Sequence, residues 1–294
     1  MRKTLCVLTL LMLLSCLPVA AGTQNNSDSI EGGAIFGGAS LAANASGAVE
    51  VTFSNLPSIA EDFTATWCDN CVYVEEALHN VSAETGAEVL HFHRNNDHQD
   101  PFGSESASAW WQQRYGTGIP PTVAFNGEEL VAGSQPQGES LDADYTALIG
   151  RETELGQGDS QFTWTLAADN ATGIFSWSLQ YNSTHTTFSE GVDSWLFIIE
   201  DSANFPEGGN GMEDYPYIVH EVILLGAQTE GMTNITLPNA WDGNDLTLML
   251  IHELPIIPVS SLPDKDSIEG GFLPSVTFVT TLAIVAIAAT FNRK

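Results

Sequence analysis

The sequence feature that most constrains the fold is a pair of cysteines three positions apart, where a predicted strand gives way to a predicted helix. Cys68 and Cys71 follow a β-prone run that ends at Trp67, and residues 72–78 place apolar side chains at helical spacing. A helix N-terminus carries free N–H groups and about half a positive charge, which stabilise a thiolate and lower its pKa. We therefore predict a reactive dithiol, with Cys68 as the nucleophile and Cys71 as the resolving thiol.

The residues around these cysteines resemble the thioredoxin active site. In that family an Asp stands six residues before the first cysteine in a D-F-x-A-x-W-C-x-x-C pattern, and residues 62–71 match it throughout. A second segment, residues 118–128, is similar to the thioredoxin cis-proline strand and its Asn-Gly turn, with Pro121 matching the cis-proline and Pro120 as a departure. The resemblance covers roughly residues 50–152 and implies an α/β thioredoxin-like domain.

The resemblance also implies roles for three residues beside the dithiol. Asp62 would be a buried acid with a raised pKa that takes the proton from the resolving thiol. Trp67 would shield the dithiol, and Pro121 would position the substrate backbone. Two plainer interpretations stay open, because Asp62 could be a solvated carboxylate at a strand end and Trp67 a core aromatic.

Two histidines leave a metal site open as an alternative. His91 and His93 could complete a zinc site with Cys68 and Cys71, since Cys-x-x-Cys with two histidines is a known zinc pattern. Histidines two positions apart on a strand share a face only with each other, and the thioredoxin pattern explains the cysteines better. We therefore expect neither a metal nor a cofactor.

The two ends of the chain predict export and a membrane anchor. Residues 1–21 combine a basic start, an apolar run and a small-residue cleavage site, as in a secretory signal peptide, although Cys16 leaves a lipoprotein open. Residues 272–291 are uncharged and mostly apolar, and Arg293 and Lys294 follow, which predicts one transmembrane helix with its end in the cytoplasm. We expect a single-pass cell-membrane protein whose ectodomain faces outside the cytoplasm, where a disulfide is permitted.

Between these ends the sequence texture divides the chain into further parts. Residues 22–48 are rich in Gly, Ala, Ser and Asn and predict a flexible linker, residues 49–154 form the thioredoxin-like domain, and residues 257–271 an acidic spacer. Residues 160–256 hold six apolar runs between turns, which predict a separate antiparallel, immunoglobulin-like β-sandwich. The predicted fold class is thus an α/β thioredoxin-like domain, an all-β sandwich and a C-terminal transmembrane helix. A calcium site is an alternative to a polar turn at Asp242, Asn244 and Asp245.

The composition predicts a strongly acidic surface. The chain has 37 Asp and Glu residues against 8 Lys and Arg residues, a formal net charge of −29. Such a surface repels nucleic acid, so we expect no nucleic-acid partner, and adaptation to saline surroundings explains it more simply than an acidic binding role. Six Asn-x-Ser/Thr sequons suit an exported glycoprotein: Asn25, Asn44, Asn80, Asn170, Asn182 and Asn234.

These features together predict an extracytoplasmic, membrane-anchored thiol-disulfide oxidoreductase. Its partners would be protein disulfide or dithiol substrates or a membrane redox protein. The alternative is a cell-surface binding or adhesion protein, in which Cys68 and Cys71 only staple a redox-inert scaffold.

Overall fold

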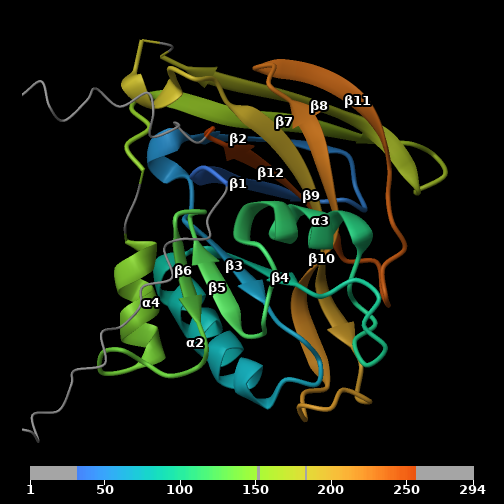
Figure 1. The fold of residues 1–294 in the computed structure, drawn as a ribbon. Helices are drawn as coiled ribbons and strands as arrows, with labels where there is room; N and C mark the ends of the chain where they lie inside the picture. The colour runs from blue at the N-terminus through green and yellow to red at the C-terminus, as the bar shows by residue number, and fades with distance from the viewer. Residues whose placement is uncertain (1–31, 151–152, 183, 256–294) are drawn as a thin grey trace, which may run out of the picture. The chain divides into compact units, whose positions relative to one another are not determined.

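Two β-sheets organise the part of the chain that the computed structural model describes, residues 32–150, 153–182 and 184–255 (Figure 1). The larger sheet has eight strands in the order β1-β12-β9-β10-β4-β3-β5-β6, and the smaller has four in the order β11-β8-β7-β2. The strands are β1 (Ile35–Ala42), β2 (Gly47–Thr52), β3 (Ile59–Phe63), β4 (Glu88–Phe92), β5 (Thr122–Phe125), β6 (Glu129–Ala132), β7 (Gly158–Leu166), β8 (Thr172–Tyr181), β9 (Asp193–Asn204), β10 (Asp214–Gly226), β11 (Glu230–Thr236) and β12 (Leu246–Glu253). The α-helices are α2 (Asp69–Thr85), α3 (Glu105–Tyr115) and α4 (Leu141–Ile149).

Local sequence signals set the ends of these helices. Ser104 and Ser140 cap the N-termini of α3 and α4, because each hydroxyl accepts a hydrogen bond from the backbone N–H three residues on. Gly86 ends α2 in the left-handed conformation at φ 76°, which a glycine adopts without steric cost. Serine caps therefore mark where α3 and α4 begin, and a glycine marks where α2 ends.

Alternation along β3 and β4 sends neighbouring side chains to opposite faces of the larger sheet. Ile59 and Phe63 pack with the aromatic side chains of α3, whereas Ala60 and Val89 pack with apolar residues of α2 and α4. Both faces of these strands are therefore covered by helices.

The predicted fold class is wrong, because the described chain is mostly β and the predicted thioredoxin-like domain and β-sandwich share one sheet. Strand β10 pairs in parallel with β4 at Ile218 and His91, which joins the strands of both regions. One core cluster also contains residues from both, with Phe92 and Phe197 in edge-to-face contact at 6.3 Å between ring centroids. The predicted thioredoxin-like domain and β-sandwich therefore share a core. Burying each such aromatic side chain stabilises the fold by about 1.5–3 kcal/mol.

Part of the predicted linker is also structured. Strand β1 lies within residues 22–48, pairs with β12 and forms one edge of the larger sheet, and β2 begins there too. Gly37 makes this pairing possible at φ 138°, since a Cβ there would lie 2.5 Å from the Leu250 carbonyl oxygen. The small residues that suggested flexibility instead permit close approach of two strands.

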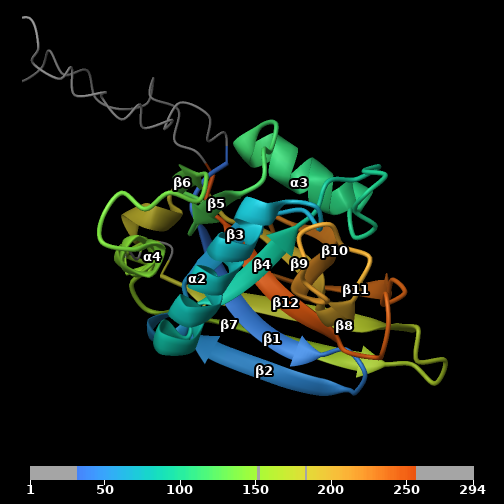
Figure 2. The same cartoon turned by 90° about the horizontal axis from the view of Figure 1, so that it is seen from below.

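The smaller sheet packs against one face of β1, β9 and β12, as a second layer in Figure 2. Aromatic residues of β7 and β8, among them Trp164 and Phe175, meet Leu196, Leu248 and Leu250 of the larger sheet. A buried histidine joins the same layers, since His252 on β12 bonds to hydroxyls on both sheets. The predicted separate immunoglobulin-like sandwich is therefore wrong, because β9, β10 and β12 share a sheet with β3–β6 and the two layers also use β1 and β2 from the N-terminal side.

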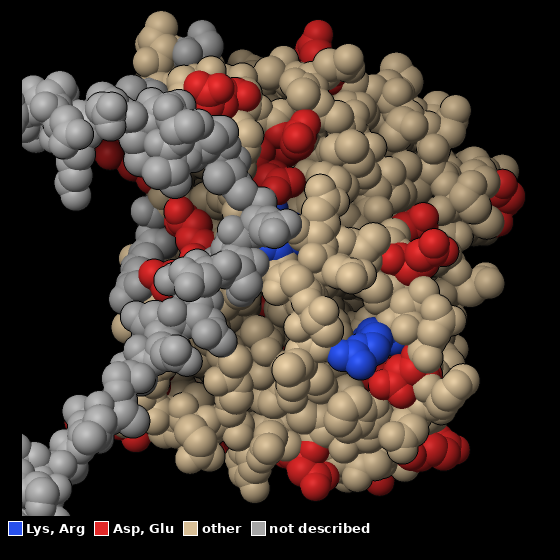
Figure 3. Space-filling view, in the orientation of Figure 1, with Lys and Arg blue, Asp and Glu red and all other residues tan. Residues whose placement is uncertain are grey.

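No helix within the described residues is long and apolar enough to cross a membrane. The predicted signal peptide at residues 1–21, the spacer at 257–271 and the transmembrane helix at 272–291 lie outside those residues. On the face shown in Figure 3, acidic side chains are scattered broadly and few basic atoms appear.

Candidate active site

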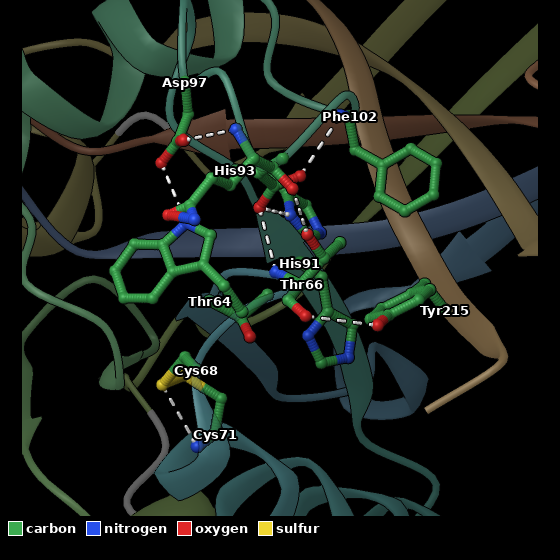
Figure 4. A network of polar contacts seen from close by, with 12 residues as sticks. Thr64, Thr66, Cys68, Cys71, His91, His93, Asp97, Phe102 and Tyr215 are labelled. Carbon is green, nitrogen blue, oxygen red and sulfur yellow. Dashed lines mark hydrogen bonds and ion pairs between the residues drawn. A yellow bond between two sulfur atoms is a disulfide. The ribbon is translucent and has the colours of Figure 1, made fainter. Parts of the chain in front are cut away.

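The two cysteines form a disulfide at the N-terminus of α2 (Figure 4). Cys68 is the N-cap residue, and its sulfur accepts a hydrogen bond from the Cys71 N–H at 3.2 Å. Cys68 keeps 7 % of its surface exposed and Cys71 none. The first cysteine is therefore the accessible one, and its sulfur lies at the positive end of the helix dipole.

A buried cluster of three titratable side chains lies on the face of the sheet that α2 covers. Asp62 and His91 are directly opposite each other on β3 and β4, and His91 Nδ1 lies 3.1 Å from an Asp62 carboxylate oxygen. Glu75 projects from α2, so that one ligand atom from each of the three residues lies within 4.8 Å of the others. The cluster thus combines two acids and one base out of contact with bulk water.

Burial and mutual charge set the protonation of this cluster. Burial raises the pKa of Glu75, although the charge of His91 and the hydroxyl that Thr64 donates at 2.5 Å oppose this effect. Burial alone would lower the pKa of His91, but the hydrogen bond to Asp62 and the charges of Glu75 and Asp62 outweigh it, so the pKa is raised. Both shifts favour the protonated forms of Glu75 and His91.

The same three residues are those that could hold a divalent cation. Asp62, Glu75 and His91 offer two carboxylates and an imidazole. The Asp62–His91 hydrogen bond would have to open first, because it occupies the Nδ1 atom. The zinc set of the sequence analysis is not formed, since Cys68 and Cys71 are in a disulfide and His93 bonds to Asp100 instead.

The loop after β4 holds the segment that leads to Cys68. The Asp100 carboxylate accepts hydrogen bonds from the backbone N–H groups of Thr66 at 3.1 Å and Phe102 at 3.2 Å, and it lies 2.7 Å from His93 Nδ1. The Thr66 hydroxyl donates to the backbone carbonyl of Gln99 at 2.9 Å. These contacts, drawn in Figure 4, fix the backbone two residues before the nucleophile.

The β9–β10 hairpin, far along the chain, contacts the same segment. The N–H of Asn210 and the hydroxyl of Tyr215 both donate to the Thr66 carbonyl oxygen, at 3.0 Å and 3.4 Å. Gly208 has to be a glycine here, because a Cβ would lie 1.9 Å from the Tyr215 hydroxyl. The sequence analysis missed this contribution, since nothing in residues 204–215 indicates which loop they touch.

Trp67 directly precedes Cys68 in the chain, and Pro121 comes close to the end of the strand that leads to it. Trp67 is 38 % exposed and donates its indole N–H to Asp97 at 3.0 Å, so it is not a core aromatic. The Pro120–Pro121 peptide bond is cis, and the pairing of Phe63 with Thr122 brings Pro121 to the end of β3 from which the chain runs to Cys68. Apolar side chains of Tyr73 and Ile119 are also exposed, at 61 % and 73 %.

Three further observations compare the site with its prediction. Asp62 is fully buried and not a solvated carboxylate, and it lies on the helix-covered face with His91. Glu75 was missed, although its position four residues after Cys71 on the apolar face of α2 could have indicated it. At the calcium alternative, Asp242 and Asp245 accept hydrogen bonds from the backbone N–H groups of Asn204 and Ser202 at the end of β9.

Comparison with known proteins gives two distant structural likenesses. No protein-family profile matches the chain, and no curated protein matches it significantly. A crystal structure of protein AGR_C_4864 from Agrobacterium tumefaciens is 17 % identical, with a TM-score of 0.41, over 61 % of this chain and 78 % of that one. HBP35 of Porphyromonas gingivalis is 16 % identical, with a TM-score of 0.39, over 68 % of this chain and 64 % of that one. Neither likeness is close enough to transfer a role to any residue, so the chemistry rests on the residues themselves.

Proposed function

We propose that this protein is a thiol-disulfide oxidoreductase whose redox centre is Cys68 and Cys71. The observation that carries the proposal is the disulfide at the N-terminus of α2, packed on the sheet face where Asp62 and His91 form a buried acid–base pair. Thiol exchange must move a proton for each thiolate formed, and a buried acid–base pair beneath α2 suits that need. The resemblance of residues 62–71 to the thioredoxin active site supports the same chemistry.

The exchange proceeds in two steps from the reduced protein. The Cys68 thiolate attacks a substrate disulfide, forms a mixed disulfide and releases one substrate thiolate. Cys71 then gives its proton to the Asp62 carboxylate, and its thiolate attacks the Cys68 sulfur, which forms the protein disulfide and releases the second substrate thiolate. The protein loses two electrons and the substrate gains two, and the same steps run in reverse from the oxidised protein.

The surface around the dithiol supports a protein substrate. Trp67 and Tyr73, close to Cys68 in the chain, and Ile119, two residues before Pro121, are large and exposed. Neither Pro120 nor Pro121 has an N–H, so a substrate backbone approaching these positions would donate hydrogen bonds rather than accept them. On the sequence evidence for export and anchoring at residues 1–21 and 272–291, the reaction would take place outside the cytoplasm at the membrane surface.

The test is the reduction potential of the Cys68–Cys71 pair in the full chain. The protein is equilibrated in glutathione and dithiothreitol buffers, the thiols are trapped, and the peptide containing both cysteines is quantified by mass spectrometry. A potential between about −120 and −270 mV is expected, as in exchanging enzymes. A potential below about −300 mV is that of a structural disulfide, and it would leave the binding or adhesion role as the better explanation.

A further inference from the structure

The buried cluster of Asp62, Glu75 and His91 lacks a permanent positive charge. Two carboxylates face one imidazole, and the three residues keep only 0 %, 7 % and 3 % of their surface exposed. In the described part of the chain, no Lys or Arg forms an ion pair with either acid. Buried carboxylates are costly to keep unless they pair with a cation or coordinate a metal. The cluster therefore offers a place for a cation from outside the chain.

One carboxylate oxygen of Asp62 has no hydrogen-bond partner. Its Oδ2 atom lies 3.1 Å from His91 Nδ1, whereas Oδ1 is buried and meets no donor among the described residues. Because both oxygens belong to one carboxylate, the unpaired atom lies beside the contact with His91. Buried polar atoms without a partner are rare in folded proteins, and a bound ion is one explanation of such an atom.

The spacing of the ligand atoms suits a small divalent cation. One ligand atom from each of the three residues lies within 4.8 Å of the other two, and the distance between Asp62 and His91 is 3.1 Å. Two ligands of a tetrahedral zinc ion lie about 3.3 Å apart, since each bond is about 2.0–2.1 Å long. The cation would therefore replace the hydrogen bond between Asp62 and His91, and Glu75 would have to approach by at most about 1.5 Å.

Two residues outside the cluster hold its side chains in place. Thr64 donates its hydroxyl to the Glu75 carboxylate. The ring of Tyr217 stacks on His91 at 8°, with centroids 6.4 Å apart, and the pairing of Ile218 with His91 brings it there. In metal sites, contacts of this kind orient the ligands and are as much a part of the site as the ligands themselves.

We propose that Asp62, Glu75 and His91 bind one divalent cation of the zinc class. One imidazole and two carboxylates are ligands that Zn²⁺ accepts, and three protein ligands leave a fourth position on a tetrahedral ion. Ca²⁺ is a poorer fit, because it needs about six to eight oxygen ligands. The bound cation would link α2 to β3 and β4. The sequence analysis weighed only the cysteines and histidines as ligands, and so missed this set.

The proposed site does not depend on the proposed redox function, because none of its ligands is a cysteine. It can form while Cys68 and Cys71 remain in their disulfide. The two proposals do share Asp62, so the cation and the exchange reaction would compete for its carboxylate.

The experiment is a titration of the full chain with Co²⁺ and then with Zn²⁺. The Cys68–Cys71 disulfide is kept oxidised, and Cys6 and Cys16 are blocked with N-ethylmaleimide, so that no thiol competes. Because the ligands are buried, the chain is refolded with the cation present, and excess Mg²⁺ occupies weak sites on the acidic surface. The expected result is one Co²⁺ per chain, with the visible bands of a four-coordinate ion and no sulfur charge-transfer band. Zn²⁺ should displace it.

Two pairs of variants separate the buried site from the acidic surface. Glu75→Gln keeps the shape of the side chain and an acceptor for Thr64, but it should bind Co²⁺ more than about 100-fold more weakly, since even loss of an outer partner costs about 10–100-fold. Glu76→Gln, at the exposed neighbouring position, should bind like the wild type. His91→Gln should lose binding in the same way, and His79→Gln, exposed on the same helix, should not.

A direct measurement on the wild type covers the case in which a variant does not fold. X-ray absorption at the zinc edge should show nitrogen and oxygen ligands at about 2.0–2.2 Å, with the scattering pattern of an imidazole. A zinc spectrum without imidazole would overturn the proposal. So would a wild type that binds no cation, or weak binding that all four variants share. None of these results depends on the reduction potential of the dithiol, so the metal site and the redox function can fail separately.

Discussion

The larger sheet contains two buried histidines whose surroundings push their pKa values in opposite directions. His91 on β4 lies against Asp62 and near Glu75, and its pKa is raised. His252 on β12 is fully buried between two hydroxyls, with Ser160 Oγ at 2.8 Å and Ser194 Oγ at 2.9 Å, and burial lowers its pKa to about 3. The residue type and the burial are alike, so the neighbours decide which histidine holds a proton.

This difference separates a titrating site from a structural one. Two serine hydroxyls satisfy the hydrogen bonds of a neutral imidazole without any charge. His252 on β12 thereby connects β7 and β9 through its two ring nitrogens. Carboxylates beside His91 raise its pKa and favour the protonated imidazole. Only this second arrangement includes a residue of α2, the helix that begins at the dithiol.

The largest expected effect comes from removing the carboxylate that distinguishes the two histidines. In a single-turnover oxidation of the reduced protein by the aromatic disulfide 5,5′-dithiobis(2-nitrobenzoate), the second release of thionitrobenzoate reports attack by Cys71. Asp62→Asn should slow this second phase about 100-fold, because Cys71 loses its proton acceptor, and should lower the pKa of His91. Stopped-flow kinetics and histidine ¹⁵N spectra measure the two effects. Glu61→Gln is the control, since Glu61 is the adjacent buried acid but bonds to Trp110 on the opposite face of the sheet. An equal loss of rate in both variants would contradict a specific role for Asp62.

The comparison can also be reversed by giving His252 a carboxylate. Ser160→Asp should raise the pKa of His252 from about 3 by roughly 2–3 units, through attraction between charges about 4 Å apart at an effective dielectric constant of about 20. Ser160→Asn has a similar shape without the charge and should leave the pKa low. Nuclear magnetic resonance titration of His252 measures both, and identical titrations would show that burial outweighs the neighbouring charge.

The lowered pKa of His252 predicts a loss of stability in acid. Between pH 6.5 and about 3 the unfolded chain binds a proton at this histidine and the folded chain does not, so stability is present above pH 6.5 and falls with pH. The slope from this one group is about 1.4 kcal/mol per pH unit. In denaturant unfolding from pH 8 to pH 4, the free energy of unfolding of His252→Gln should fall with pH less steeply than that of the wild type, by that amount. Parallel curves would mean that His252 already binds a proton in the folded protein.

Glu75→Gln should give the smallest effect and the opposite sign. Burial raises the pKa of Glu75, so its contribution to stability is complete below pH 4.5 and is lost as pH rises through the folded-state pKa. Relative to the wild type, the free energy of unfolding of the variant should therefore rise as pH increases from 4.5 to neutral, partly offset by lost attraction to His91. Unfolding of Glu76→Gln, on the exposed side of the same helix, should show no such gain.

Local features of this protein could be read from the sequence, and pairings between distant strands could not. Residues 62–71 predict the strand, the helix start and the dithiol, because each depends on neighbours in the chain. The alternation in β10 shows which side chains are buried, but it does not say that Ile218 pairs with His91 and not with another strand of a sandwich. The Tyr217–His91 stack follows from that pairing, so the sequence contained no signal for it.

The prediction that residues 22–48 form a flexible linker was wrong for a related reason. The small residues of β1 resemble a flexible segment, and only the partner strand β12 shows that Gly37 is needed for close approach. Glu75 is different, since its helical position beside Cys71 was visible and an acid on an apolar face is a signal in itself.

The pairing of β10 with β4 means that the part of the chain that carries the Cys68–Cys71 disulfide is not a transferable module. A gene fragment that stopped near residue 155 would lack the strand that hydrogen-bonds to β4 and the side chains of Phe197, Ile199 and Val219 that complete its core. The bare strand edge and apolar surface would favour aggregation. The dithiol segment and strands β9 and β10 therefore form one folding unit.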